Sequence, residues 1–306
     1  MSTGTTTKNS PDPAPTGPAT PGGPPAGLAM AVVAMSAVQL SSALAVPLFD
    51  RLGALGTAGL RLAWAGLLLF VAVRPWRGGP ARRDLGWCAA LGLATAGMMV
   101  FFMLAIAHLP LGTASALEFL GPLAVSLFGP GRGRGVWTVL AAGGVLMLTE
   151  PWHAGGADLA GVAYALAAAC CWAAYILLTQ RVGDRVTGLG GLAVSMPVAG
   201  MVGLLVGAPS LWGRLDWTAL LVVLGLALLS PLLAFTLEFL ALRRLTVSAF
   251  GTLMCLEPAV AVLAGMAVLG QVPGLAPAAG VALVVAAGVG ATRVGARPGP
   301  DVPSPA

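Results

Sequence analysis

The sequence predicts an all-α integral membrane protein with ten transmembrane helices, built as two inverted five-helix repeats. Three observations lead to this prediction. Of the 306 residues, 58% are hydrophobic and only 9% are charged, whereas about 25% are charged in a typical soluble domain. The apolar residues form runs long enough to cross a bilayer, which takes about 20 helical residues. The cationic residues gather in alternate connections, as the positive-inside rule requires.

The composition also excludes several classes of protein. A soluble globule of this length could not cover its surface with so few charges, which argues against a cytosolic enzyme. The formal net charge is +5, but the cations are too few for a phosphate-tracking groove, so we expect no nucleic-acid partner. The four cysteines lie in apolar runs without CxxC spacing or a nearby histidine, so neither a metal site nor a disulfide frame is predicted. We expect no cofactor, and without a phosphate-binding loop there is no direct coupling to ATP.

The first repeat is expected at residues 27–149, after a Pro-, Thr-, Gly- and Ser-rich tail at 1–26 that we expect to be disordered. Its helices are continuously apolar and do not alternate with period two, which argues against a transmembrane β-barrel. Charged, Pro-rich or Gly-rich connections separate them. The five helices are predicted at 27–49, 53–73, 85–107, 111–128 and 136–148.

The second repeat is expected at residues 158–292, followed by a Pro-rich tail at 293–306 that we again expect to be disordered. Several of its connections are only a few residues long, and nothing in them resembles a folded extramembrane domain. The five helices are predicted at 159–179, 189–207, 217–242, 247–269 and 275–292. Within the second of these, Gly203 and Gly207 form a small-xxx-small pair that favours close helix packing.

Charge placement supports an even number of helices. With a cytoplasmic N-terminus, 13 of the 16 cations fall in inside segments. Arg51 and Arg214 fall in outside loops, and Arg61 falls within a helix. An odd count would place the C-terminal arginines on the wrong side. We therefore expect both termini in the cytoplasm and a multi-pass protein of the bacterial inner (plasma) membrane.

Weak internal similarity indicates the repeat. At an offset of 136 residues Pro122 meets Pro258, and at an offset of 134 the pair Asp50–Arg51 meets Asp184–Arg185. Because five helices is an odd number, the second copy must enter the membrane upside down. Inverted repeats are a transporter architecture, with the solute site near the bilayer midplane where the copies meet.

Four ionisable residues fall within the predicted helices: Arg61, Glu118, Glu238 and Glu257. Each costs about 2.5–3.5 kcal/mol at the bilayer centre, so each must face a cavity or a partner. Arg61 and Glu118 lie at similar depths below the outer face. Two interpretations stay open for this pair, a solute and proton site or a static salt bridge between two helices.

Glu257 directly precedes Pro258, which frees the backbone carbonyl four residues earlier. A freed carbonyl beside a carboxylate suits a cation, an ammonium group or a proton; alternatively, the glutamate caps its own broken helix. Glu238 lies about one turn from the inner end of its helix. It could face the pathway, or it could extend to the interface where Arg243 or Arg244 neutralises it.

Other polar and aromatic residues could line the same pathway. Gln39, with Ser41 and Ser42, could contact a polar solute or hydrogen-bond between helices. Tyr175 could wall the cavity or pack against neighbouring helices. Pro122 and Pro258 could mark weakened helices that line the pathway, although proline is also simply tolerated in membrane helices.

Several stretches resemble a known family. They are PLGTASALEFLGPLAVSLF at 110–128, LAGVAYALAAACCWAAYILLTQRVG from 159, LEFLALRRL at 237–245 and FGTLMCLEPAVAVLAGMAVLG at 250–270. With them, the sequence is similar to the EamA family of the drug/metabolite transporter superfamily, most closely its threonine/homoserine exporter branch. The resemblance covers roughly residues 27–292.

The resemblance implies an inner-membrane exporter of small amino acids, especially threonine and homoserine, driven by the proton motive force. Glu118, Glu238, Glu257 and Arg61 fall on matching family positions. The chain departs from the branch at Val46, where a lysine is frequent, at Met99 and Met103, and at Gln271, where a glutamate is usual. The first two differences leave the solute pocket less polar.

We therefore expect a proton antiporter that works by alternating access and exports an amino acid, with the lipid bilayer as its surroundings and a homodimer as one possible assembly. One alternative is an exporter of another solute, such as a lipophilic cation or a purine. A further alternative is an intramembrane enzyme or scaffold. An enzyme would need clustered His, Asp or Ser residues near the interface, and the short loops offer none.

Overall fold

A computed structural model describes residues 23–74, 81–128, 134–150, 158–186, 190–242, 244–245 and 247–295. These residues are almost entirely helical and include no β-strand. The first described helix begins at Gly23 and the last ends at Gly295, so residues 1–22 and 296–306 of the expected tails lie outside the described chain. The helix bounds are α1 Gly23–Ala45, α2 Phe49–Val73, α3 Leu85–His108, α4 Leu111–Glu118, α5 Leu120–Phe128, α6 Arg134–Thr149, α7 Leu159–Gly183, α8 Gly190–Leu211, α9 Trp217–Ala227, α10 Ala234–Leu242, α11 Val247–Met254, α12 Glu257–Leu269 and α13 Leu275–Gly295.

Five helical segments of the described chain are long and apolar enough to cross a membrane. They are Pro25–Val73, Arg82–His108, Leu159–Gly183, Gly190–Leu211 and Thr252–Leu269, of which the first contains both α1 and α2. Shorter apolar helices of 10–17 residues accompany them. Large apolar side chains also face outward, including Leu205 and Val139 at 72% exposure and Leu263 at 65%. A surface of this kind is typical of a protein surrounded by lipid.

Two of the predicted helices are broken at matching places. Helix α4 ends at Glu118 and α11 ends at Met254, in each case four residues before a proline, Pro122 or Pro258. A proline cannot donate to the carbonyl four residues earlier and its ring crowds that carbonyl, so the helix stops there. Helices α4 and α11 each have eight residues, and their bounds differ by the 136-residue offset found in the sequence.

A third break was not predicted. The expected helix at 217–242 divides into α9, a π-helical turn η4 (Leu228–Leu233) and α10. Within η4, Ser230 has an extended backbone with φ −149° and ψ 121°. It precedes Pro231, and a residue before proline is driven toward the extended region.

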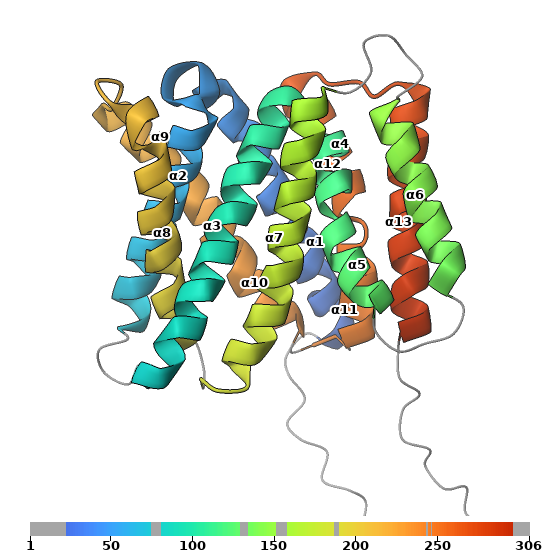
Figure 1. Cartoon of the computed structure of the whole chain (residues 1–306), viewed down its shortest axis with the longest axis horizontal. Helices are drawn as coiled ribbons and strands as arrows, with labels where there is room; N and C mark the ends of the chain where they lie inside the picture. The colour runs from blue at the N-terminus through green and yellow to red at the C-terminus, as the bar shows by residue number, and fades with distance from the viewer. Residues whose placement is uncertain are drawn as a thin grey trace, which may run out of the picture.

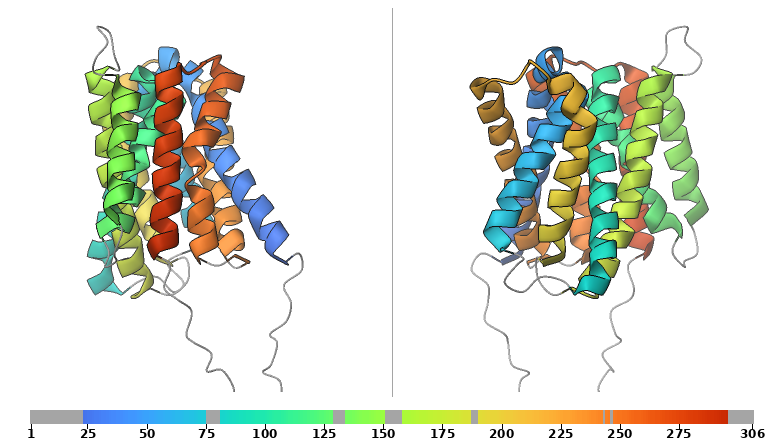
Figure 2. Two further views of the ribbon diagram at one scale, coloured as in Figure 1. Left: turned by 90° about the vertical axis from the view of Figure 1, so that its right-hand side faces the viewer. Right: turned by 60° about the vertical axis from the view of Figure 1, so that its left-hand side comes forward.

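The helices form one bundle (Figure 1), in which α1 begins and α13 ends at the same end. We call this the lower end and the opposite one the upper end. The broken pair α4–α5 runs from the upper end to the lower, whereas α11–α12 runs the other way (Figure 1). Helices α6 and α13 lie side by side at one edge, and α2 and α8 lie together toward the other (Figures 1 and 2).

Helices α2 and α8 pack through glycine. A Cβ added at Gly59 would overlap the carbonyl oxygen of Gly203, and one added at Gly207 would overlap that of Leu55. The prediction that Gly203 and Gly207 serve close packing is therefore confirmed. Close backbone approach of this kind is a common way for membrane helices to associate.

Candidate functional site

A cavity of about 300 Å³ lies in the centre of the bundle. Helices α1, α2, α3, α4, α5, α7, α10, α11 and α12 all contribute residues to its wall, together with η4. Of the eight residues singled out from the sequence, seven line it: Gln39, Arg61, Glu118, Pro122, Tyr175, Glu238 and Glu257. The eighth, Pro258, is buried beside it at the start of α12, where it helps to place the helix break.

Arg61 is a buried cation that forms no ion pair with a carboxylate in the part of the chain that the structure describes. Its side chain is 1% exposed. Nη2 donates a hydrogen bond to Ser41 Oγ at 3.0 Å, and Nη1 lies 3.6 Å from Met103 Sδ. Ser41 in turn donates to the carbonyl of Leu226 at 3.0 Å. The Nε atom has no partner among the described residues.

Glu118 forms the C-terminal end of α4 and is 8% exposed. It lines the same cavity as Arg61, but among the described residues no ion pair joins the two. The static salt bridge considered from the sequence is therefore not present in this structure. The cavity thus holds a guanidinium and a carboxylate that form no ion pair with any described residue, a charge arrangement that a zwitterionic solute complements.

Glu257 is tied to α1 through Gln39. The Gln39 Nε2 atom donates to Glu257 Oε1 at 3.0 Å and lies 3.5 Å from Ser115 Oγ. This one amide therefore connects α1 with both α12 and α4. Gln39 Oε1 has no partner in the described chain, so an acceptor stays free inside the cavity. Both interpretations of Gln39, helix bridging and cavity lining, are consistent with this geometry.

Glu238 on α10 also lines the cavity. The alternative, neutralisation at the interface, depended on Arg243 or Arg244. Arg243 lies outside the described residues, and Arg244 Nη1 instead donates to the carbonyl of Leu240 at 3.2 Å and contacts Met30 Sδ at 3.4 Å. Three carboxylates and one guanidinium thus line the cavity.

The remaining wall is mostly apolar and aromatic, with Ser42 and Ser230 as its polar members. Phe119, at the break after α4, meets Trp172 edge-on with ring centroids 6.1 Å apart. Met99 lines the cavity, whereas Met103 contacts Arg61. Sequence reasoning missed Ser230 and Phe250 as lining residues. The dipeptide Ser230–Pro231 inside an apolar run was the signal that could have indicated the first.

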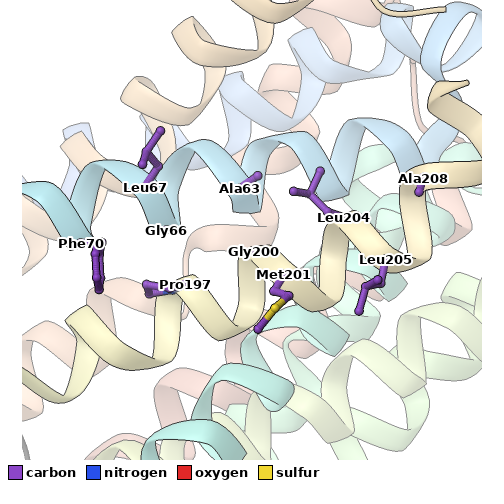
Figure 3. Close-up of a pocket in the computed structure, with 10 residues that line it drawn as sticks. All are labelled: Ala63, Gly66, Leu67, Phe70, Pro197, Gly200, Met201, Leu204, Leu205 and Ala208. Carbon is purple, nitrogen blue, oxygen red and sulfur yellow. The ribbon is translucent and has the colours of Figure 1, made fainter. Parts of the chain in front are cut away.

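A second hollow lies on the side of the bundle, between α2 and α8 (Figure 3). Its volume is about 540 Å³, larger than that of the central cavity. Its lining has no side chain that can ionise or hydrogen-bond: Ala63, Gly66, Leu67, Phe70, Pro197, Gly200, Met201, Leu204, Leu205 and Ala208. Several of these are strongly exposed, among them Leu205 at 72%. Such a groove suits lipid chains, so the polar central cavity is the better solute site.

Two polar pairs lie at the upper end, away from the cavity. Arg51 meets Asp216 at 2.5 Å, and His108 Nδ1 meets Asp158 Oδ2 at 2.7 Å. Each aspartate also caps a helix, by accepting from Ala219 N or Ala160 N. The pKa of Asp216 is lowered by the hydrogen bond from the backbone N–H of Ala219 and by the hydrogen bond from the Arg51 side chain. The hydrogen bond with the His108 side chain lowers the pKa of Asp158. Both pairs were missed, although an aspartate before an apolar run is a helix-start signal.

Comparison with known proteins agrees with this architecture. The EamA-like transporter family model matches residues 159–292. The threonine/homoserine exporter RhtA of Salmonella typhimurium is 39% identical over 267 residues, covering 85% of this chain and 89% of that protein. RhtA of Escherichia coli K12 is 39% identical over 269 residues, with the same coverage. The chain belongs to the EamA-like transporter family. It is therefore a membrane transporter and not an enzyme.

A solved structure supports the fold of this EamA-like transporter. It is described only as "Crystal structure of protein", and it matches with a TM-score of 0.55 at 19% sequence identity. The match covers 85% of this chain and 95% of the solved one. At this identity the likeness concerns the fold alone.

Proposed function

We propose that this protein exports small amino acids of the threonine and homoserine class from the cytoplasm by proton antiport. The observation that carries the proposal is the central cavity, where no ion pair among the described residues joins Arg61 to any of the three glutamates that also line it. An amino acid brings one carboxylate and one ammonium group, so it complements both. The relatives named threonine/homoserine exporters point to the same solute class.

In the proposed complex the solute carboxylate binds Arg61, whose Nε atom is free to donate. The ammonium group binds Glu257 or Glu118, which line the same cavity as Arg61. The free Gln39 Oε1 atom can accept from a side-chain hydroxyl. A hydroxyl-bearing amino acid would then supply partners to both Arg61 Nε and Gln39 Oε1, the two unpartnered polar atoms of this set.

Coupling follows from the same carboxylates. An ionised glutamate inside a membrane is costly unless a cation or a proton accompanies it. In the proposed cycle a proton from outside displaces the ammonium group from the glutamate. The protonated glutamate then carries this proton inward. One carboxylate thus carries solute outward and a proton inward, which gives exchange without ATP.

We further propose ten membrane crossings in two inverted repeats, 27–149 and 158–292, with both termini cytoplasmic. The matched bounds of α4 and α11, and their opposite directions, support the repeat (Figure 1). The shared lower end of the first and last helices supports an even number of crossings. Alternating access would arise as the repeats rock around the central cavity.

The substrate class can be tested with purified protein in proteoliposomes. Vesicles loaded with radiolabelled homoserine, threonine or alanine would be diluted into solute-free buffer. Equally loaded vesicles without protein are the control. We expect faster efflux of homoserine and threonine than of alanine, because only the first two offer a hydroxyl to Gln39. Equal efflux of all three from protein-containing and protein-free vesicles would refute the proposal.

A second candidate is export of an organic cation. Three glutamates against one arginine, with aromatic walls at Phe119 and Trp172, favour a positively charged solute over an anion. The same vesicles loaded with a lipophilic cation distinguish the candidates. Efflux of the cation without efflux of homoserine would replace the amino-acid proposal by this one.

A further inference from the structure

A group of charged and aromatic residues at the lower end of α3 and α7 lies outside the transport site. We call it the Trp87 cluster, and its members are Arg82, Arg83, Asp84, Trp87, Arg181 and Arg185. The first four surround the start of α3, and the last two stand at the end of α7. The two helix ends lie next to each other, at the same end of the bundle as the start of α1 (Figures 1 and 2).

The indole of Trp87 contacts two guanidinium groups, that of Arg181 on α7 and that of Arg185 just after α7. The Cζ atom of Arg181 is 5.1 Å from the indole centroid, and that of Arg185 is 5.4 Å. Both distances fall within the range of a cation–π contact, about 6 Å. A guanidinium that stacks on a ring keeps its N–H edge free for an anion. The ring thus holds two cationic groups in place without neutralising either.

Asp84 fixes the other side of the cluster. Its side chain is 7% exposed and lies 3.8 Å from Arg185 and 3.7 Å from Arg83. Even with Asp84 and the neighbouring Asp184 included, the four arginines leave a formal charge of +2. The side chain of Arg83 is 88% exposed. The amino end of α3 points to the same place and adds a positive helix dipole.

Apolar surface leads away from the cluster along both helices. Leu177, one turn before Arg181 on α7, is 53% exposed, and on α3 Leu85 is 41% and Leu93 is 55% exposed. A tryptophan at this level is typical of the membrane–water interface. A ligand with an anionic head and apolar tails would therefore fit both parts, whereas a free phosphate ion would leave the apolar surface unused.

We propose that the Trp87 cluster binds the headgroup phosphate of an anionic phospholipid from the leaflet at the lower end. Arg181 and Arg185 donate to the phosphate, and the acyl chains lie on Leu177 and the exposed leucines of α3. Basic pockets between helices at the cytoplasmic side are a known type of lipid site. Because α3 carries Met99 and α7 carries Tyr175 into the cavity, a lipid that joins these helices also steadies the cavity wall.

The test uses the full-length protein in nanodiscs of phosphatidylcholine, with or without one quarter phosphatidylglycerol. Phosphatidylglycerol should raise the Tm of the wild type, and native mass spectrometry should detect retained phosphatidylglycerol. Arg181→Gln with Arg185→Gln should remove the Tm rise and reduce the retained lipid at least twofold. Arg214→Gln, at the upper end, is the matched control and should behave as wild type.

Two further arms keep the proposal falsifiable. Trp87→Leu retains every charge but frees the arginines, so it should reduce retained phosphatidylglycerol even if the double variant does not fold. Inorganic phosphate added to phosphatidylcholine nanodiscs should not raise the Tm. A Tm rise of wild-type size in the double variant, or an equal rise with inorganic phosphate alone, would overturn the lipid assignment. Because the readouts are lipid retention and Tm, they do not depend on which solute is exported.

Discussion

At the scale of single residues, the transport proposal depends most on Arg61. A buried arginine without a carboxylate partner lowers stability, and proteins rarely keep one without a reason in function. Its charge faces the cavity that also holds Glu118, Glu238 and Glu257. In the proposed complex the solute carboxylate is the partner of Arg61.

Replacing Arg61 should therefore impair transport without lowering the stability of the protein. Truncating one partner of a buried charge pair costs about 2–5 kcal/mol of binding, so Arg61→Met should raise the KM for homoserine about 30-fold or more. Because the free protein leaves the cation unpaired, the Tm should hold or rise. Efflux kinetics and thermal melts check both parts. A fall in Tm with an unchanged KM would show that Arg61 is structural.

Some of the residues that line the cavity were easier to predict from the sequence than others. The cost of a charge in the membrane was enough to name Arg61, Glu118 and Glu257. The direction that Glu238 faces was harder to predict, since it depends on the register of α10. The π-helical turn η4 precedes α10 and changes that register. Helical periodicity taken through 217–242 therefore misplaces the face on which Glu238 lies.

At the scale of elements, α4 contacts both α12 and the loop after α12. Every residue of α4 is buried. The Gln271 Oε1 atom accepts from the backbone N–H of Leu111, the first residue of α4, at 2.9 Å. A Cβ at Gly112 would overlap Val262 of α12. The sequence marked Gln271 only as a departure from the family, because its role as a cap depends on distant segments meeting.

Losing this cap should loosen the upper end. Gln271→Leu leaves the first N–H of α4 without its acceptor, and loss of a helix cap costs about 0.5–2 kcal/mol. We expect a lower Tm for this variant. Gln271→Glu keeps an acceptor oxygen and should stay close to wild type. If the leucine and glutamate variants melt at the same temperature, Gln271 does not act as a cap.

The pair α2 and α8 offers a test of packing. A Cβ at Gly59 would meet backbone atoms of Gly203, which cannot move aside as a side chain can. Gly59→Ala should destabilise the protein by about 1–3 kcal/mol, as expected for overpacking. Gly225 on α9 has open space around a Cβ, so Gly225→Ala is the control and should not lower the Tm. Equal melting of the two variants would contradict the packing described.

The positions of the elements were largely predictable, because each apolar run had to be a helix to satisfy its backbone in lipid. The breaks after Glu118 and Met254 followed from Pro122 and Pro258. The turn at Leu228–Leu233 was missed because the apolar run continues through it. Within that run only the dipeptide Ser230–Pro231 marks the place where the helix changes type.

At the scale of the whole molecule, the two proline-broken helices are alike in the length of α4 and α11 and in the place of the break. The broken helices bring Glu118 and Glu257 from opposite directions to the same cavity. Charge asymmetry and the 136-residue offset predict such opposite directions from sequence. That both carboxylates line one cavity, and that no ion pair joins Arg61 to a described carboxylate, depends on the packing of helices that are far apart in the chain.

In the proposed cycle solute and proton share a cavity carboxylate, so a pH gradient across the membrane should drive efflux through that carboxylate. Proteoliposomes loaded with homoserine would be placed in buffer that is more acidic outside than inside. We predict that the gradient accelerates efflux through the wild type and through the control Asp50→Asn, whose carboxyl is exposed. In Glu257→Gln or Glu118→Gln, or in both, the acceleration should disappear. Acceleration of wild-type size in both glutamine variants would contradict the account.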